Sequence, residues 1–397
     1  MQPIVVTAMG IISSIGNSVE ENLYSLREGK PQISRLDNLR STLRDNIKVG
    51  EIKLSNSELA KQLGIDPRAE YSRTALLGIW AAKEAIAGLS ADEVKSLGFV
   101  SASTVGGMDK TEQFFYEYKT NVEARRHIYT HNIGENTRMI ADYFGIGGMA
   151  TAVSTACSSS ANAIMVGTNL LRTGRLSQVL VGGSDALCKF TINGFNSLMI
   201  LSDDACKPFD RNRKGLNLGE GAAYLLIETE ENAIRHGRTV LAVLSGWGNT
   251  NEAYHQTASS AEGDGAAAAM AKALDVASIA PHEIDYINAH GTATDNNDMS
   301  ESVAIRRIFG NEVPDFSSTK AFTGHTLAAA SSVEAVYSIL SIRESVVFPN
   351  LNFENPIEET NLTPQTTLKH KPIRNVLSNS FGFGGNCSTL IFSKYEK

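Results

Sequence analysis

The sequence predicts an α/β protein whose sheets contain parallel strands and are covered by helices. Short apolar runs alternate with helical patterns along most of the chain, as expected where strands are followed by helices. The 397 residues allow two or three domains or one large duplicated unit. Residues 154–183 and 319–349 each contain a turn of small residues, an apolar helix and a return to a strand or loop. We therefore predict an internal duplication with halves of 1–240 and 241–397.

The first elements follow from local signals. Residues 4–7 form a short apolar run, which predicts a buried strand. A helix is predicted over 18–27, because Asn17 can cap its first turn and Gly29 can end it. The polar stretch 31–67 predicts an irregular surface segment.

A helix rich in alanine and leucine is predicted over 70–89. Residues 108–146 are typical of an insertion, because they lie between two strand-like segments and mix aromatic residues with Arg125 and Arg126. No low-complexity tract or linker rich in proline, glycine and serine divides the chain, so we predict one compact unit made of two halves.

Charge and composition narrow the function. The chain has 36 Lys+Arg against 43 Asp+Glu and a net charge of −7, which argues against nucleic acid or an anionic membrane as the main partner. No segment approaches eighteen uninterrupted apolar residues, so no membrane span is predicted. The four cysteines contain no C-x-x-C pair, which indicates neither a disulfide framework nor a metal site. We expect a cytoplasmic protein with reduced thiols, since the N-terminal stretch lacks the features of a signal peptide.

Cys157 is the candidate nucleophile. It precedes a Ser-Ser-Ser-Ala run that opens a helix ending near Gly174. A thiol at a helix N-terminus faces the positive end of the helix dipole, which lowers its pKa and favours the thiolate. Most cysteines are small buried hydrophobes, and we expect that structural role for Cys188, Cys206 and Cys387, which lack this setting.

Two histidines occupy positions where α/β folds gather their sites. His290 ends the strand-like run IDYINAH, and His325 lies at the entry to a helix, five residues after Lys320. Either histidine alone is as typical of a structural residue as of a functional one. Their glycine-flanked settings distinguish them from most other histidines of the chain.

The segment NSFGFGGNCS near the C-terminus has three glycines in four positions, at 382, 384 and 385. Such a loop can bring main-chain N–H groups close to a ligand and supply an oxyanion-hole donor, or it can be an ordinary turn. It lacks the G-K-[ST] ending and the strand–helix context of a phosphate-binding loop.

Two other patterns have competing interpretations. Asp298 and Glu301 have the spacing of a carboxylate pair or of metal ligands, and equally of a capping box that starts a helix over 299–309, which we favour. A Cys–His pair also occurs in cysteine proteases, but these give no role to two glycine-flanked histidines and a lysine.

Taken together, these segments resemble the β-ketoacyl-acyl carrier protein synthases of the thiolase superfamily, in particular the elongating type with a Cys-His-His site. The resemblance spans nearly the whole chain and follows the family's order. It rests on the blocks VVTAMGIISSIGNSVEENLYSLREGK, TACSSSANAI, KPFDRNRKGLNLGEGAA, GWGNTNEAYHQTA, NAHGTAT, SSTKAFTGHTLAAASSVEA and NSFGFGG.

The resemblance implies a thiolase-like five-layer αβαβα fold made of two duplicated halves, the first carrying the nucleophilic cysteine and the second both histidines. It implies Claisen condensation of an acyl chain with malonyl-acyl carrier protein, with release of carbon dioxide, in fatty acid or polyene and polyketide-type biosynthesis. The partners would be acyl- and malonyl-loaded acyl carrier protein and a second subunit, usually in a homodimer, with a heterodimer as the alternative. No bound cofactor or metal is implied, since the phosphopantetheine arm arrives with the carrier.

The resemblance also implies residue roles. Cys157 would take the acyl group as a thioester, and its N–H with that of Phe383 would form the oxyanion hole. His290 and His325, as neutral imidazoles, would promote decarboxylation of malonate and stabilise the carbanion. Phe383 would also gate the acyl pocket. The remaining roles are a supporting charged pair (Lys320 and Glu334), substrate contacts (Thr257, Thr292, Thr294 and Phe381) and further supporting residues (Asp298 and Glu301).

An acidic carrier would dock on basic residues around the pocket mouth, although any single basic residue can be ordinary solvated charge. The candidates are Arg68, Arg73, Arg125, Arg126 and Lys207.

The sequence departs from the family pattern around the site. Asp295 stands where a proline is common, Ala328 and Ser331 where glycines are usual, and Asn386-Cys387 where Thr-Asn is typical. These changes indicate a specialised branch that makes polyene or other secondary acyl chains, such as aryl polyenes.

Two alternatives stay open at this point. A chain-length-factor-like partner has this fold but lacks the nucleophilic cysteine, whereas Cys157 and both histidines are present here. A thiolase acting on coenzyme A thioesters uses a second cysteine as base, and Cys387 lies after Gly384-Gly385 in a different setting.

Overall fold

A computed structural model of the chain describes residues 2–66, 68–69 and 71–396. Within these residues the strands are β1 (Ile4–Ser13), β2 (Gly98–Ala102), β3 (Ala150–Val153), β4 (Gln178–Asp185), β5 (Gly221–Thr229), β6 (Ala242–Asn251), β7 (Tyr286–Asn288), β8 (Asp315–Ser317), β9 (Val346–Val347), β10 (Lys369–His370), β11 (Asn375–Gly382) and β12 (Asn386–Ser393).

The helices are described in the same residues. They are α1 (Val19–Arg27), α2 (Asn56–Leu63), α3 (Arg73–Ala85), α4 (Ala91–Ser96), α5 (Met108–Phe114), α6 (Val122–Tyr129), α7 (Ile133–Phe144), α8 (Ser159–Arg172), α9 (Lys189–Ser197), α10 (Glu230–Arg235), α11 (Asp264–Ala277), α12 (Asp295–Phe309), α13 (Lys320–Thr323) and α14 (Ala330–Glu344), with 3-10 turns η1 (Pro281–Glu283) and η2 (Leu327–Ala329).

The main sheet has the same strand pattern in its two halves. Its order is β3-β2-β4-β5-β1-β6-β12-β11-β7-β8. From either edge toward the middle, the first three strands run parallel to one another. Each of the next two strands is antiparallel to the strand before it. Strands β1 and β6 join the halves through only two residue pairs, Val5–Val243 and Val6–Ala242. The order is therefore repeated about the β1–β6 junction.

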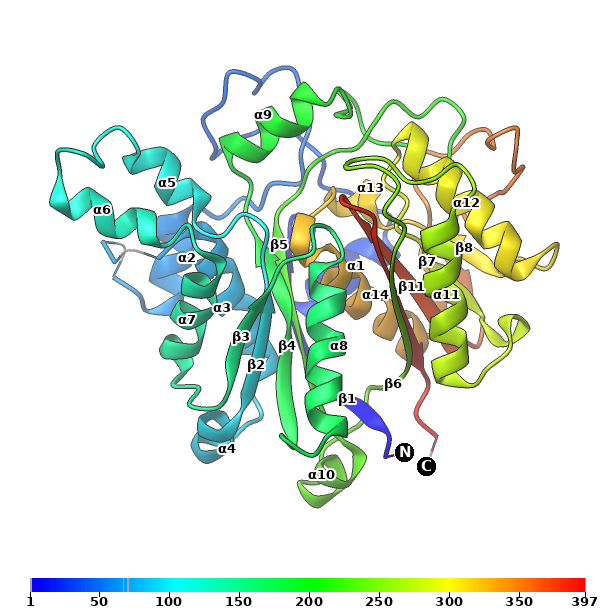
Figure 1. Ribbon diagram of the computed structural model, residues 1–397, viewed down its shortest axis with the longest axis horizontal. Helices are drawn as coiled ribbons and strands as arrows, with labels where there is room; N and C mark the ends of the chain where they lie inside the picture. The colour runs from blue at the N-terminus through cyan, green and yellow to red at the C-terminus, as the bar shows by residue number, and fades with distance from the viewer. Residues whose placement is uncertain (1, 67, 70, 397) are drawn as a thin grey trace.

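Helices divide the molecule into layers. Helices α8 and α14 contact each other and lie in the middle, α8 on β4 and β2 and α14 on β11 and β5 (Figure 1). On the outer faces α3 packs on β1, β5 and β4, while α11 packs on β6 and β12. Every residue of α14 from Ala330 to Ile342 is buried, as expected for a helix covered on all sides. The two halves of the sheet are thus the two β layers, with α8 and α14 between them and α3 and α11 outside them. The predicted five-layer αβαβα fold is confirmed.

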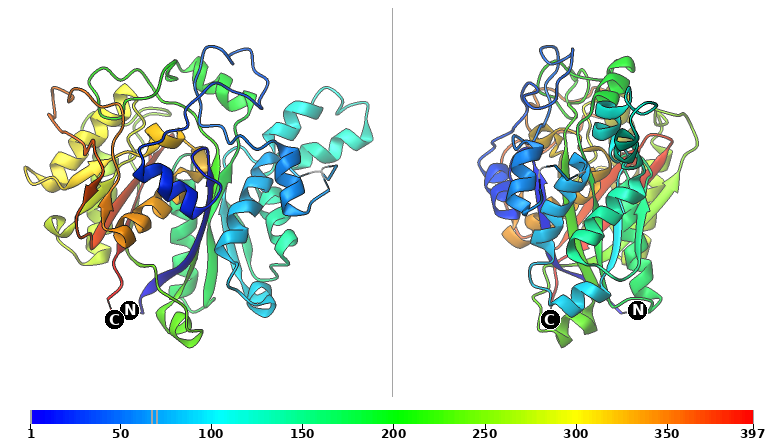
Figure 2. Two further views of the ribbon diagram at one scale, coloured as in Figure 1. Left: turned by 180° about the vertical axis from the view of Figure 1, so that it is seen from behind. Right: turned by 90° about the vertical axis from the view of Figure 1, so that its left-hand side faces the viewer.

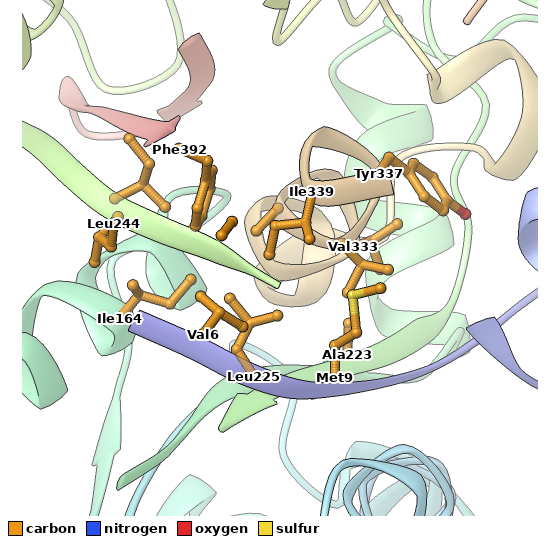
Figure 3. Packing of buried hydrophobic residues seen from close by; sticks show 14 of the residues in the cluster. Val6, Met9, Ile164, Ala223, Leu225, Leu244, Val333, Tyr337, Ile339 and Phe392 are labelled. Atoms are coloured by element: carbon orange, nitrogen blue, oxygen red, sulfur yellow. The ribbon is translucent and has the colours of Figure 1, made fainter. Parts of the chain in front are cut away.

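The central core joins both halves of the chain. Side chains from the two central helices interdigitate with those of the strands on either side (Figure 3). The cluster includes Val6, Ile164, Leu225, Leu244, Val333, Ile339 and Phe392. Burying apolar area contributes about 25 cal/mol per Å², so this shared core stabilises the two halves against each other.

The predicted N-terminal elements are found with changes. The strand predicted over 4–7 extends to Ser13 in β1, and helix α1 is capped by the Ser18 hydroxyl rather than by Asn17. The stretch predicted to be irregular contains α2, which a capping box between Ser55 and Glu58 starts. Pro67, where that stretch was expected to end, lies outside the described residues.

The helix predicted over 70–89 corresponds to α3, which is capped by Ser72. Glu70, its expected first residue, lies outside the described residues. The predicted insertion forms α5, α6 and α7, and the first two project from one side of the molecule (Figures 1 and 2). Both chain ends lie at the opposite end of the molecule from α9 (Figure 1).

Candidate active site

A cavity of about 220 Å³ brings the predicted site residues together. Cys157, His290 and His325 all line it, although they are far apart in the sequence. Phe383 lines it as well. So do the four predicted substrate contacts, Thr257, Thr292, Thr294 and Phe381. Among the residues predicted to be catalytic, Lys320 alone does not line the cavity, because it lies behind His290.

Cys157 lies in a tight turn between β3 and α8. The preceding residue, Ala156, has a φ of 54°, a left-handed conformation that costs a non-glycine residue roughly 1–2 kcal/mol. The turn is held by Ser159, whose hydroxyl donates to the carbonyl of Ala156 at 2.5 Å and accepts from the N–H of Thr155 at 2.8 Å. The strained backbone therefore presents the thiol to the cavity at the start of the helix.

The glycine-rich tail approaches this turn closely. A Cβ on Gly382 would lie 2.7 Å from the Thr155 carbonyl oxygen and 3.2 Å from the Cys157 nitrogen, so only glycine fits. The next residue, Phe383, donates its backbone N–H to the Cys157 sulfur. The loop therefore brings a second main-chain donor to the Cys157 sulfur, the arrangement that the predicted oxyanion hole requires.

The thiol of Cys157 is not a resting thiolate, which corrects the expectation from the helix dipole. Burial raises its pKa to about 11, although the charge of Lys320 and the N–H of Phe383 act to lower it. Desolvation of the anion thus outweighs both favourable contacts. Attack by the sulfur therefore requires that its proton be removed during the reaction.

His290 is held by Lys320. The ammonium of Lys320 donates to the His290 carbonyl at 2.5 Å and lies 3.4 Å from the Nδ1 of the same residue. An ammonium can only donate, so Nδ1 accepts and the ring proton is on Nε2. The segment after β7 thus presents an N–H donor at His290.

His325 has the same tautomer for a different reason. The backbone N–H of Leu327 donates to its Nδ1 at 3.3 Å, so Nε2 carries the proton. Its own backbone pairs with residues on either side of Leu218, through the Asn217 carbonyl at 2.7 Å and the Gly219 N–H at 2.9 Å. The ring is therefore fixed both by its main chain and by its own turn.

The two imidazoles are neutral. Burial lowers the pKa of each histidine well below its ordinary value, and the nearby charge of Lys320 acts in the same direction. The rings stand edge to face with centroids 5.4 Å apart. Two buried, neutral N–H donors that line one cavity can stabilise a negative charge that develops between them.

Lys320 and Glu334 form the predicted charged pair at hydrogen-bonding distance, and both side chains are buried. Burial raises the pKa of Glu334 to about 7, while Lys320 and then the hydroxyl of Ser380 act to lower it. The carboxylate is on α14, so the central helix fixes the ammonium that orients His290.

Asp298 and Glu301 do not form a capping box, which corrects the sequence interpretation. Helix α12 starts earlier, at Asp295, and both carboxylates are buried inside it. Glu301 accepts the backbone N–H groups of His290 and Gly291 at 2.9 and 2.8 Å. Asp298 accepts the N–H of Ala293 at 3.0 Å. They therefore support the loop that carries His290.

The cavity wall contains an aromatic pair that sequence reasoning missed. Phe195 of α9 stacks on Phe383 with ring centroids 5.7 Å apart and planes 17° apart. On the other side Phe381 packs at an angle against the His290 ring at 5.6 Å. The only sequence signal for Phe195 was an aromatic residue in a small apolar helix, which does not show where that helix packs.

The predicted docking residues differ in their accessibility. Arg73 is buried and pairs with Glu220 through two hydrogen bonds of 2.8 and 2.6 Å, so it is excluded as a docking residue. The other four are on the surface, although three have acidic neighbours: Arg68 pairs with Asp66, Arg126 with Glu123 and Lys207 with Glu354, while Arg125 is exposed.

The other cysteines are free and buried, as expected for structural residues. Cys387 packs on Gly265 and Glu252 and is absent from the residues that line the cavity with Cys157. Within the described part of the chain, no three His, Cys, Asp or Glu side chains are grouped to hold a metal ion, and no helix is long and apolar enough to cross a bilayer.

Comparisons with known proteins identify the family of the chain. The family model for the N-terminal domain of β-ketoacyl synthases matches residues 1–233, and that for the C-terminal domain matches residues 241–354. The chain is 33% identical to nodulation protein E of Rhizobium meliloti (strain 1021), covering 98% of this chain and 99% of the relative. It is also 33% identical to 3-oxoacyl-[acyl-carrier-protein] synthase 2 of Staphylococcus aureus (strain COL), covering 99% and 98%.

Among solved structures, the ishigamide ketosynthase/chain length factor superposes with a TM-score of 0.93 at 29% identity, covering all of both chains. The chain belongs to the β-ketoacyl synthase family. It is a condensing enzyme of the acyltransferase type, and it performs Claisen condensation in fatty acid or polyketide-type biosynthesis.

Proposed function

We propose that the protein extends a Cys157-bound acyl chain by decarboxylative condensation with malonyl-acyl carrier protein, giving 3-oxoacyl-acyl carrier protein. The observation that carries the proposal is the single cavity lined by Cys157, His290 and His325. The covalent intermediate divides the reaction into an acyl transfer and a carbon–carbon bond formation.

In the acyl transfer, the Cys157 sulfur attacks the thioester carbonyl and the carrier thiol leaves. The carbonyl oxygen becomes negative in the transition state, and the N–H groups of Cys157 and Phe383 stabilise it. Because the resting thiol is protonated and both imidazoles present N–H groups, the thiol proton passes to the departing carrier sulfur, so that the carrier leaves as a thiol.

In the second step, malonyl thioester loses its carboxylate as carbon dioxide, and the electron pair passes to the thioester enolate. The enolate oxygen lies between the Nε2–H groups of His290 and His325. The carbanion then attacks the Cys157 thioester, and the sulfur leaves and takes up one proton. The neutral tautomers are set by Lys320 and Leu327, so the donors are in place before the charge appears.

Intact-protein mass spectrometry with a panel of acyl-carrier proteins tests this function. We expect the mass of one acyl group on the wild-type chain and none on Cys157→Ala. Cys188→Ala is the matched control, because Cys188 is equally free and buried but does not line the cavity. Loading that survives Cys157→Ala would contradict the proposal.

We further propose that the carrier docks on basic residues at the surface, first on the partly exposed Lys207. Lys207 lines a second cavity that shares Lys214 with the catalytic one, so it lies beside the mouth. The phosphopantetheine arm then passes Thr257, Thr292 and Thr294, and no cofactor or metal bound by the protein itself is needed. Charge reversal at Lys207 is expected to weaken carrier binding in a salt-dependent way.

The assembly and pathway are proposals of the same kind. We expect a cytoplasmic homodimer, with a heterodimer as the alternative, and mass measurement in solution distinguishes the two. The halves 1–240 and 241–397 are proposed as duplicated units that meet at the cavity. The departures at Ala328, Ser331 and Asn386-Cys387 support a specialised acyl chain, which the same carrier panel tests.

A further inference from the structure

Asp185 is a buried carboxylate whose place in the site was not evident from the sequence. It is the last residue of β4 and is fully buried. Five groups donate to it: the Ser103 hydroxyl at 2.6 Å, the Thr104 N–H at 3.0 Å and hydroxyl at 2.5 Å, the Val105 N–H at 3.2 Å and the Ala328 N–H at 2.9 Å. Burial raises the pKa of the Asp185 carboxyl, while the hydroxyls of Ser103 and Thr104 and the N–H groups of Ala328 and Val105 act to lower it.

The Ala328 bond connects Asp185 to the turn that holds His325. Ala328 follows Leu327, whose N–H donates to the His325 Nδ1 and whose φ is 54°. A buried leucine keeps a left-handed conformation only where its surroundings hold it there. The bond from Ala328 to Asp185 holds the residue directly after the strained one.

We propose that Asp185 is a positioning residue for His325: by fixing the Ala328 N–H it keeps Leu327 left-handed, and so keeps the Leu327 N–H on Nδ1 and the ring proton on Nε2. This inference rests on the proposed role of His325 as a donor to the enolate. Without the anchor, Leu327 relaxes, Nδ1 loses its donor, and a fraction of the rings carries the proton on Nδ1. Those rings have no Nε2–H for the enolate oxygen.

Asp185→Asn tests this role, because it keeps the shape but replaces one of the two accepting oxygens by an NH₂ group, which cannot accept. We expect condensation to fall by about 10²-fold, as for loss of one oxyanion donor, while acyl loading of Cys157 changes little. Nitrogen-15 NMR of the His325 ring, assigned with His325→Ala, is expected to show a shift of the Nε2–H tautomer toward a mixture.

The matched control is Glu51→Gln. Glu51 is also a buried carboxylate, and it accepts the backbone N–H groups of Asp37, Asn38 and Leu39 at 2.6, 3.1 and 2.9 Å. It does not line the catalytic cavity, so its loss is expected to lower stability but to leave the ratio of the two half-reactions and the His325 spectrum unchanged.

Three outcomes separate the possibilities. If Asp185→Asn, like Glu51→Gln, changes neither the ratio of the two half-reactions nor the His325 tautomer, the inference about Asp185 is wrong, while the proposed function is unaffected. His325→Ala that leaves condensation intact overturns the proposed function. If Asp185→Asn does not fold, Thr104→Val serves as the second variant, because it removes one hydroxyl donor to the Asp185 carboxylate. We expect it to lower the rate of condensation relative to acyl loading severalfold. An unchanged ratio of the two rates then overturns the inference.

Discussion

The substitution Gly382→Ala tests the proposed oxyanion hole, because it adds one methyl group beside it. In Gly382→Ala the new Cβ would lie 2.7 Å from the Thr155 carbonyl oxygen, below the 3.0 Å that real Cβ atoms keep, and 3.2 Å from the Cys157 nitrogen. Both obstacles are backbone atoms, so the tail loop and the nucleophile turn must separate by a few tenths of an ångström. These are the two segments whose N–H groups are proposed to hold the oxyanion.

One oxyanion donor contributes about 3–4 kcal/mol, and a misplacement of about 1 Å costs roughly 10²-fold in rate. We therefore expect Gly382→Ala to slow acyl loading and condensation alike, each by about tenfold to 10²-fold. Mass spectrometry of loading and release of carbon dioxide from malonyl-carrier measure the two steps, with circular dichroism to verify folding.

Gly147→Ala is the matched control. Its Cβ would lie 2.9 Å from the Lys95 carbonyl oxygen, a similar clash with backbone, but in the turn before β3 and outside the catalytic cavity. We expect it to lose stability without loss of rate per folded molecule. If Gly382→Ala keeps both rates, or loses only one of them, then this loop does not supply a donor common to both steps.

Three further predictions follow from the charges of the site. His290→Ala or His325→Ala is expected to lower condensation by about 10²-fold or more while acyl loading falls much less, and equal losses in separate half-reaction assays would contradict their roles. Because the pKa of Cys157 is raised to about 11, alkylation by iodoacetamide is expected to speed up about tenfold per pH unit from pH 7 to 9; a plateau in that range would indicate a thiolate. Lys207→Glu is expected to weaken carrier binding in a salt-dependent way. Arg73→Met is instead expected to destabilise the fold by about 3–5 kcal/mol, because it leaves Glu220 without its ion-pair partner. If carrier binding by the two variants depended on salt in the same way, the distinction between Lys207 and Arg73 would be refuted.

The sequence was sufficient for the fold class and for the groups that meet in the cavity. The alternation of apolar runs and helical patterns reflects burial, which is a local consequence of the fold. Cys157, His290 and His325 were recognisable because each stands where a strand ends or a helix begins, among small residues. These local settings persist in the folded protein.

Properties that depend on distant neighbours were not predictable. Two carboxylates at positions i and i+3 are compatible with a capping box and equally with the buried face of a helix. The hydrogen bonds of Asp298 to Ala293 and of Glu301 to His290 show that the second arrangement is present. The helix α2 was missed although its capping box, Ser55 and Glu58, is visible in the sequence, because the surrounding stretch is polar. Arg73 resembled a surface charge until Glu220, remote in the chain, was placed beside it.

The burial of the site residues explains why the helix-dipole argument gave the wrong charge state for Cys157. Desolvation penalises every charged form, so the burial that raises the pKa of the thiol also lowers the pKa of both imidazoles. A resting thiolate would be a better nucleophile for acyl loading. An imidazolium would be a stronger donor, but it would also protonate the carbanion that it stabilises. Neutral imidazoles avoid that side reaction, since neither ring is then a strong acid beside the enolate before carbon–carbon bond formation. The raised pKa of the Cys157 thiol and the lowered pKa of both imidazoles therefore have one cause, and the condensation depends on the second of them.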